Sequence, residues 1–192
     1  MPGWPQSTSD GCCMAEAVIG LGSNIGDGQV NLCRAWKMLA LEPDIDPQGL
    51  SSPYATEPVG MASKNWFTNG VGFAYTNLAP RRLLNVLLRI ETELGRNRGC
   101  SGKKWADRTV DLDLLYYDDL VCAAPELVIP HPGIQNRLFV LLPLAELLPD
   151  KLHPVLGMTA KQMIKQLMAA AGGASLPEVK KMQWRQDVLA LK

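Results

Sequence analysis

Apolar and polar residues alternate most clearly between positions 110 and 116, and this period of two predicts a β-strand. Successive side chains of a strand point to opposite faces, so Asp111 and Asp113 share one face. Their Cα atoms would lie about 7 Å apart, which is two rises of roughly 3.3 Å. The residues expected on the opposite, apolar face are Val110, Leu112, Leu114 and Tyr116.

The rest of the pattern predicts strands and helices separated by turns rich in Gly, Pro and Asn. Strands are expected at 17–21, 49–54, 66–76 and 120–122, with a loop at 43–48. Helices are expected after a cap at Asn24 or Asp27 as far as about Leu41, and at 80–94, 135–148 and 152–167. Residues 118–119 are expected to form a hairpin turn, and residues 169–177 a linker.

Two polar residues interrupt apolar faces and therefore need partners if they are buried. Asn69 lies in an aromatic strand, two residues from Phe67 and on the same face. It forms either a cross-strand hydrogen bond or a contact with a planar heterocycle on which Phe67 stacks. Glu91 lies four residues after Leu87 on the leucine stripe of the helix at 80–94. It either pairs with an arginine at the helix edge or belongs to a charged site.

The aspartate pair alone favours an ordinary edge strand with two solvated acids, because the D-x-D pattern is common. If the two carboxylates are buried together, they repel each other unless cations neutralise them. Hard oxygen ligands on an open face suit Mg²⁺, with phosphates completing its shell. The preceding segment 95–108 carries three glycines and five cations, which is typical of phosphate binding in phosphoryl transfer. His131, held between two prolines, is either a plain loop residue or a phosphate contact.

Composition argues against several classes of protein. The 192 residues carry 19 basic and 19 acidic side chains, a balance that is unlike that of a general binder of nucleic acid or anionic membranes. No apolar run approaches the ~20 residues of a membrane span, and the N-terminus lacks the pattern of a signal peptide. The five cysteines are scattered, which argues against a disulfide framework or a zinc site. We therefore expect the protein to be located in a reducing cytoplasm. We expect a disordered extension at 1–16, one domain at 17–168, and a linker and C-terminal tail at 169–192.

Five motifs recur in an order and spacing that are specific in combination. They are G-S-N at 22–24, T-E-P-V-G at 56–60, L-G-R-x-R at 94–98, W-x-x-R-T-V-D-L-D at 105–113 and P-H-P-x-x-x-x-R-x-F-V-L at 130–141. Over about residues 17–149, the chain thereby resembles the 6-hydroxymethyl-7,8-dihydropterin pyrophosphokinases of folate biosynthesis. The resemblance implies an α+β fold, a ferredoxin-like sandwich with a central, mainly antiparallel sheet and helices packed on it.

The same resemblance implies the reaction and its partners. The β,γ-diphosphate of ATP would pass to the hydroxymethyl group of 6-hydroxymethyl-7,8-dihydropterin, with release of AMP. Two Mg²⁺ ions would act with ATP as cofactors. The partners implied are these two substrates, in a cytoplasmic monomer that binds neither nucleic acid nor a membrane.

The resemblance also assigns roles to particular residues. Asp111 and Asp113 would hold the two Mg²⁺ ions, and one of them would orient the pterin hydroxyl for in-line attack. Arg96 and Arg108 would complete the catalytic set by stabilising the transferring diphosphate. The residues expected to bind the pterin are Thr56, Pro58, Val59, Gly60, Phe67, Asn69, Trp105 and Phe139. The residues expected to bind ATP are Glu91, Arg98, Lys104, Arg108, Leu114, His131 and Arg137.

The chain departs from the residues usual in this family at several positions. Leu88 stands where relatives often carry Gln, so a contact to ATP is expected to be missing. Asp107 belongs to a W-A-D-R motif that commonly reads W-G-P-R, and its charge is expected to slow loop closure or weaken phosphate binding. Lys104 offers a point charge where Arg can occur, and Phe67 lacks the hydroxyl of a Tyr seen in some members. None of these changes removes the metal ligands or the pterin sandwich, so an active enzyme is expected.

Two other functions are compatible with parts of the pattern. A D-x-D glycosyltransferase would use the aspartates to hold a metal-bound nucleotide sugar, but it would need a larger nucleotide-binding domain. A non-catalytic RNA-binding module would present sheet aromatics to bases. In that case, two acids at the centre of the face would repel the phosphates.

Overall fold

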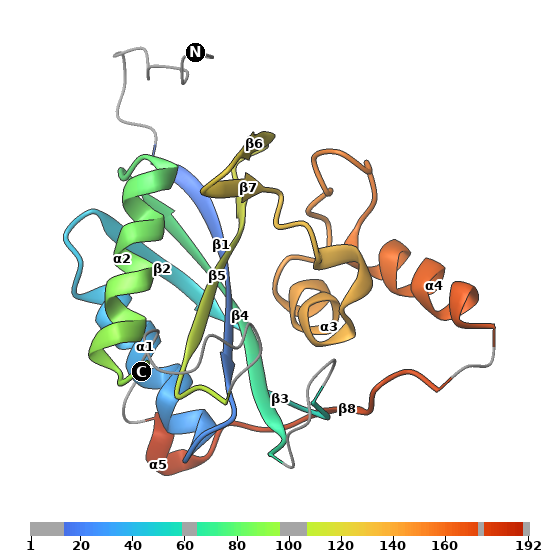
Figure 1. Cartoon of the computed structure of the whole chain (residues 1–192), viewed down its shortest axis with the longest axis horizontal. Coiled ribbons are helices and arrows are strands. Elements are labelled where there is room, and N and C mark those ends of the chain that lie inside the picture. Colours follow the sequence, from blue (N-terminus) through green and yellow to red (C-terminus); the bar gives the residue numbers. More distant parts are fainter. Residues whose placement is uncertain (1–13, 59–64, 97–106, 173–174, 190–192) are drawn as a thin grey trace.

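The computed structural model describes residues 14–58, 65–96, 107–172 and 175–189 (Figure 1). The strands are β1 (Ala15–Ser23), β2 (Ile45–Leu50), β3 (Tyr54–Thr56), β4 (Phe67–Thr76), β5 (Asp111–Tyr117), β6 (Cys122–Ala124), β7 (Leu127–Ile129) and β8 (Val179–Lys181). The helices are α1 (Gly28–Ala40), α2 (Pro80–Glu93), the short 3-10 helix η1 (Ile134–Asn136), α3 (Leu138–Leu147), α4 (Ala160–Ala171) and α5 (Gln186–Leu189).

The main sheet has the strand order β5-β1-β4-β3-β8, and β2 pairs with β4 beyond the end of β3. All of its strand pairs are antiparallel. Because β2 and β3 together line one edge of β4, the elements from β1 to β5 follow the order β-α-β-β-α-β with β1 and β4 at the centre. The expected ferredoxin-like α+β sandwich is therefore confirmed.

One face of the sheet is covered by α1 and α2 (Figure 1). The side chain of Asp27 accepts the N–H of Val30 at 3.2 Å, so Asp27 rather than Asn24 caps α1. Pro80 stands in the first turn of α2, where its missing N–H costs no hydrogen bond. The larger apolar cluster lies between these helices and the sheet, and Ile19 and Leu112 belong to it.

The opposite face is covered by α3, against which α4 packs (Figure 1). The apolar cluster on this face joins Val71 of β4 to Leu141 of α3 and Met163 of α4. Thr159 and Gln162 form a capping box at the start of α4. Among the described residues, no helix combines the length and the apolar character that crossing a membrane requires.

Strict alternation ends within β5. The register against β1 shifts between Val18 and Ile19, so Leu115 and Tyr116 both join the cluster beneath α3. Leu114 remains in the cluster beneath α1 and α2. The expectation that Tyr116 shares a face with Leu114 is therefore wrong, because a bulge adds one residue to one strand and resets the alternation.

Several expected boundaries also differ from the structure. β2 begins at Ile45, inside the expected loop, and it tolerates Pro47 because the register shifts there beside an irregular edge. The short strand expected at 120–122 is β6, which pairs with β7 and not with β5. The helix expected at 152–167 begins only at Ala160, because the residues before it form a turn closed by an isolated bridge.

The C-terminal residues pack onto the domain instead of leaving it as the expected linker and tail. α4 continues to Ala171, beyond the expected start of the linker. β8 pairs with β3, and α5 contacts α1. Figure 1 shows this segment in red, running from the side of α4 past β3 to the side of α1. At the other end, β1 already begins at Ala15, inside the expected extension.

Candidate active site

The two aspartates of β5 lie beside two glycines of β1. Asp111 pairs with Gly22, and Asp113 pairs with Gly20. A Cβ atom added at Gly22 would lie 3.0 Å from Asn69 Oδ1, and one added at Gly20 would lie 3.3 Å from the side chain of Leu115. The backbone of β1 therefore forms a floor without side chains beside the two carboxylates, and both glycines line a cavity.

Asp111 is the centre of a cluster of charged side chains. Arg96, which follows α2, donates to its Oδ1, and Arg108 donates to its Oδ2 at 2.5 Å. Arg96 also donates to Glu91, which is only 1% exposed. The carboxylate of Glu91 in turn accepts the backbone N–H of Leu112 at 2.8 Å. Glu91 therefore joins α2 to β5 and holds Arg96 against Asp111, which explains an acid on an apolar stripe.

Asp113 lies in a less favourable environment for its negative charge. Burial, and then the charge of Asp111, raise the pKa of Asp113 to about 6, against the opposing effects of Arg137, Arg108 and Arg96. The described residues contain no group of three or more His, Cys, Asp or Glu side chains that could enclose a metal ion. Two adjacent carboxylates nevertheless fit Mg²⁺, which keeps several waters and completes its shell with substrate phosphates.

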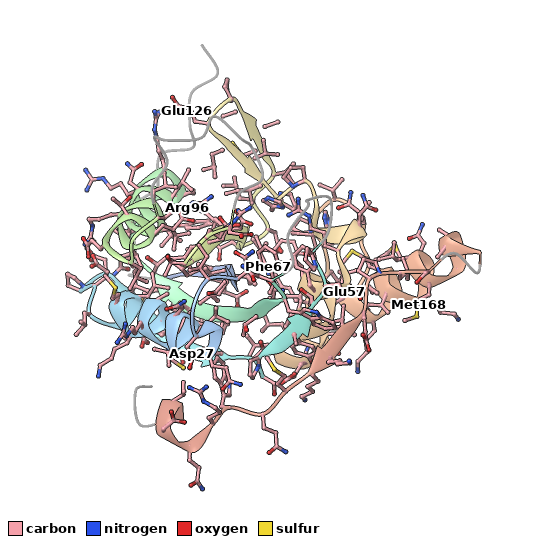
Figure 2. All side chains as sticks on the ribbon, turned by 60° about the horizontal axis from the view of Figure 1, so that its bottom comes forward. Asp27, Glu57, Phe67, Arg96, Glu126 and Met168 are labelled. Atoms are coloured by element: carbon pink, nitrogen blue, oxygen red, sulfur yellow. The ribbon has the colours of Figure 1, made fainter. Side chains whose placement is uncertain are left out.

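A cavity on one side of the aspartates is lined by aromatic rings and a fixed amide. Phe67 of β4 and Phe139 of α3 both border it. Asn69 Nδ2 donates to Thr56 Oγ1 at 2.7 Å, and both residues are buried. Figure 2 shows Phe67 near Glu57, another residue of the lining. The cross-strand bond therefore fixes an amide that also borders the cavity, so the two hypotheses for Asn69 are compatible. Such a lining suits a flat heterocycle with a polar edge.

A groove lies on the other side of the aspartates and shares both of them with the cavity. Its apolar walls come from α2, β5 and the β6–β7 hairpin, and they include Leu84, Leu88, Leu114, Leu127 and Val128. Glu126, labelled in Figure 2, lines the groove from the hairpin and pairs with Arg81 of α2. Two ligands that occupied the cavity and the groove would therefore meet at Asp111 and Asp113.

His131 and Arg137 come from the segment between β7 and α3, but they face different spaces. His131 lines the groove, and its backbone N–H donates to the carbonyl of Leu115 at 3.0 Å. Burial, together with Arg137 and against Asp111, lowers the pKa of His131, so the imidazole is neutral at pH 7. Its Nδ1 accepts the N–H of Gly133 at 3.2 Å, which places the proton on Nε2. Arg137 lines the cavity instead, 5.9 Å from the centre of the Phe139 ring.

The structure brings together all but one of the expected site residues that it describes. The exception is Pro58, which lines neither the cavity nor the groove. The residues in contact with one or both spaces are Thr56, Phe67, Asn69, Glu91, Arg96, Arg108, Asp111, Asp113, Leu114, His131, Arg137 and Phe139. Five further expected residues lie outside the described ranges: Val59, Gly60, Arg98, Lys104 and Trp105.

Sequence reasoning missed the role of Asn24. Its Oδ1 accepts the N–H of Arg108 at 2.8 Å, its own N–H donates to the carbonyl of Arg108 at 3.1 Å, and its Nδ2 donates to Asp107 at 2.7 Å. Asn31 of α1 donates to Ser23 and Ile25 and so fixes the turn that carries Asn24. Asp107, whose negative charge was expected to disturb the site, accepts a hydrogen bond from the side-chain amide of Asn24. The sequence marked Asn24 as a possible helix cap and as part of the G-S-N motif, and neither signal pointed to Arg108.

Sequence comparisons relate this chain to known proteins. The sequence profile of 7,8-dihydro-6-hydroxymethylpterin-pyrophosphokinase (HPPK) matches residues 18–149. The chain is 42% identical to the 2-amino-4-hydroxy-6-hydroxymethyldihydropteridine pyrophosphokinase of Methylorubrum extorquens over 137 residues, 71% of this chain and 85% of that protein. It is also 42% identical to the enzyme of the same name from a Synechocystis species, over 81% of this chain and 77% of that protein.

Solved structures share the fold at much lower identity. The crystal structure of Plasmodium falciparum HPPK-DHPS with pteroate superposes with a TM-score of 0.66 and is 14% identical. The match covers 84% of this chain but only 46% of that protein, so this chain spans less than half of its length. At this identity the likeness concerns the fold alone.

Proposed function

Because this chain belongs to the 7,8-dihydro-6-hydroxymethylpterin-pyrophosphokinase family, we propose that Asp111 and Asp113 mark the point at which its two substrates react. The chain is a pyrophosphokinase of folate biosynthesis. Its substrates are ATP and 6-hydroxymethyl-7,8-dihydropterin. The cavity takes the pterin, the groove takes ATP, and the diphosphate passes between them beside the aspartates.

The cavity lining supports the pterin assignment. Phe67 and Phe139 offer aromatic faces on which the ring stacks. The amide of Asn69, held by Thr56 at 2.7 Å, matches the alternating donors and acceptors along the edge of the pterin. The floor of Gly20 and Gly22 lets the ring approach the backbone of β1. The hydroxymethyl group then points toward the aspartates.

The groove suits ATP for a different reason. The apolar walls at Leu84, Leu88 and Leu127 accept the adenine ring, and the neutral imidazole of His131 donates from Nε2 to a phosphate oxygen. Asp111 and Asp113 would hold two Mg²⁺ ions, which would supply positive charge to neutralise the phosphates of ATP. The fit rests on the donor set, because two adjacent carboxylates are the protein ligands that magnesium with a nucleotide uses.

Arg96 and Arg108 supply positive charge where the diphosphate passes. Both donate hydrogen bonds to Asp111. We propose that they exchange this carboxylate for diphosphate oxygens when the nucleotide arrives. Arginine suits this role because its planar fork binds phosphate oxygens in pairs. Glu91 keeps Arg96 on the correct side of β5 through its bond to Leu112.

The observation that carries the assignment is that the cavity and the groove share one wall, formed by Asp111 and Asp113. The test is product analysis by chromatography after incubation with ATP, Mg²⁺ and 6-hydroxymethyl-7,8-dihydropterin. We expect AMP and diphosphorylated pterin in equal amounts. An Asp113→Asn chain serves as the matched control, because it keeps the size of the side chain and loses the charge.

Each outcome has a clear meaning. AMP formed in step with the pterin product supports attack on the β-phosphorus. ADP in its place would show that the γ-phosphate moves, so the site would be correct and the geometry of attack wrong. Absence of any pterin-dependent turnover in the unchanged chain would contradict the proposal.

A further inference from the structure

The C-terminal residues 178–188, which we call the C-terminal strap, extend the sheet beside the cavity. The N–H of Glu57 donates to the carbonyl of Glu178 at 3.2 Å, and Glu57 Oε2 accepts the N–H of Glu178 at 3.1 Å. Further along, the N–H of Met182 donates to the carbonyl of Pro53 at 2.8 Å. The strap therefore covers the whole outer edge of β3, from one end to the other.

The far end of the strap is anchored to the body of the domain. The indole of Trp184 donates to the carbonyl of Ser51 at 3.0 Å. Arg185 donates to Asp27, the cap of α1, at 2.6 Å. Val188 of α5 is fully buried. Figure 1 shows the strap crossing from β3 to α1, and Asp27 is labelled in Figure 2. These anchors fix the strap independently of the cavity.

The strand that the strap covers carries part of the cavity wall. β3 ends at Thr56, whose hydroxyl accepts the amide of Asn69 at 2.7 Å, and Glu57 follows it into the lining. β3 is only three residues long and pairs with β4 on its other side. So short a strand has few bonds of its own to resist displacement. The strap is the second of the two strands that hold Thr56 in place.

We propose that the C-terminal strap is a positioning element for pterin binding, which acts by fixing Thr56 and thereby the orientation of the Asn69 amide. The strap lies beyond residues 18–149, to which the family profile extends. The inference rests on the proposed function, because it assigns the cavity to the pterin. The strap makes no contact with the groove, which Glu57 and Thr56 do not line. Loss of the strap therefore weakens pterin binding and leaves nucleotide binding unchanged.

A pair of substitutions at Lys180 separates the backbone of the strap from its side chains. In an antiparallel ladder, hydrogen-bonded pairs alternate with non-bonded pairs. The pairs Glu57 with Glu178 and Pro53 with Met182 are bonded, so Lys180 bonds Ala55 between them. Lys180→Pro removes this backbone donor, whereas Lys180→Ala keeps it. Both remove the side chain, whose ammonium lies 5.1 Å from the centre of the Trp66 ring, so their difference reports on the backbone of the strap.

The measurement is calorimetric titration of each chain, first with the Mg²⁺ complex of α,β-methylene-ATP and then with the pterin on top of it. For Lys180→Pro we expect the pterin Kd to rise by about tenfold or more, since small displacements of positioning groups are costly. The Kd of the nucleotide analogue should stay within about twofold of the wild-type value. Lys180→Ala should match the wild type for both ligands.

Other results would overturn the inference. Equal pterin affinity in Lys180→Pro and Lys180→Ala would contradict it. An equal loss of affinity for the pterin and for the nucleotide analogue would contradict it too, because that result indicates a general effect on the fold. If Lys180→Pro does not fold, the same titrations of Trp184→Phe test the inference. This substitution removes the indole donor to the carbonyl of Ser51 and keeps an aromatic ring. Trp184→Phe should raise the Kd of the pterin by less than the tenfold expected for Lys180→Pro, and it should leave the Kd of the nucleotide analogue unchanged. A wild-type chain that binds no pterin would contradict the proposed function itself.

Discussion

The carboxylate of Glu91 accepts the backbone N–H of Leu112 at 2.8 Å, so an acid on the buried side of α2 is bonded to the strand that carries both aspartates. The same carboxylate holds Arg96. Glu91→Ala would leave the buried N–H of Leu112 without this acceptor and Arg96 with Asp111 alone, and we expect the free energy of unfolding to fall by about 1–3 kcal/mol. Glu91→Gln keeps an acceptor for Leu112 and should lose less. Urea unfolding of both variants checks this order, and a wild-type midpoint for Glu91→Ala would contradict it.

Substitution of either aspartate should reduce activity, but only one of the two substitutions should reduce the stability of the fold. Asparagine at either position removes a carboxylate that we propose as a magnesium ligand, and we expect AMP formation to fall by about a thousandfold or more, which is several kcal/mol of transition-state stabilisation. In the metal-free protein, Asp111→Asn should also destabilise the fold, because it leaves Arg96 and Arg108 without their shared partner. Asp113→Asn should not, because burial and Asp111 oppose its charge.

Thermal unfolding without magnesium measures the second half of this prediction, with Asp119→Asn as a control on the exposed turn after β5. If Asp113→Asn proved less stable than Asp111→Asn, the account of the charge cluster would be wrong.

Asn24→Ala should slow the reaction without preventing folding. The substitution removes two side-chain bonds that hold Asp107 and Arg108, while the backbone bond of Asn24 to Arg108 remains. We expect kcat to fall by up to about a hundredfold, since a misplaced Arg108 would be less able to bind the diphosphate as we propose. Asn65→Ala, which removes a 3.3 Å contact to Asp107 and leaves both bonds of the Asn24 side chain, is the matched control. Steady-state kinetics at saturating substrates provide the measurement, and an unchanged kcat in Asn24→Ala would refute this role.

Leu88→Gln should restore a nucleotide contact. Leu88 lies in the groove wall, one turn before the end of α2, so a longer amide there reaches the space assigned to ATP. One neutral hydrogen bond of 0.5–1.5 kcal/mol corresponds to a KM for ATP that is lower by about two- to tenfold. kcat should not change, because the contact is made equally in the ground state. Leu88→Met controls for the change of shape, and an unchanged KM in Leu88→Gln would argue that the adenine lies elsewhere.

Glu146 should make stability depend on pH in the acid range. Burial alone would raise its pKa, but hydrogen bonds from Tyr54, Ser52 and Lys181 lower it to about 2. The unfolded chain therefore takes up the proton first as the pH falls, and this contribution is fully present above the ordinary value of 4.5 and lost toward 2. Glu146→Gln should flatten the dependence over that range. Urea unfolding at a series of pH values tests this, and parallel curves for the two chains would exclude Glu146 as the cause.

Local pattern was sufficient to predict several parts of the site. The alternation around Asp111 and Asp113 identified the strand and the shared face, because the period of two is a property of the backbone. Asn69 and Glu91 stood out as polar residues on apolar faces, and both proved to be buried and bonded. In each case the signal was a conflict between one residue and its immediate neighbours.

Other parts depend on partners distant in sequence and leave no local trace. The bulge at Leu115 arises from the pairing of β5 with β1, and nothing in the residues around it marks the extra position. Asn24 meets Arg108 across 84 positions. β8 forms because β3 offers it an edge, so its own short polar sequence could not predict a strand.

The floor of glycines also bears on inhibitor resistance. A compound that lies on Gly20 and Gly22 contacts backbone atoms, which no substitution can remove. Any side chain added there would approach Asn69 or Leu115, at 3.0 Å or 3.3 Å for the Cβ alone, and would occupy space that we assign to the pterin. A substitution that excluded the compound would therefore exclude the substrate too. We expect few viable resistance mutations at these two glycines.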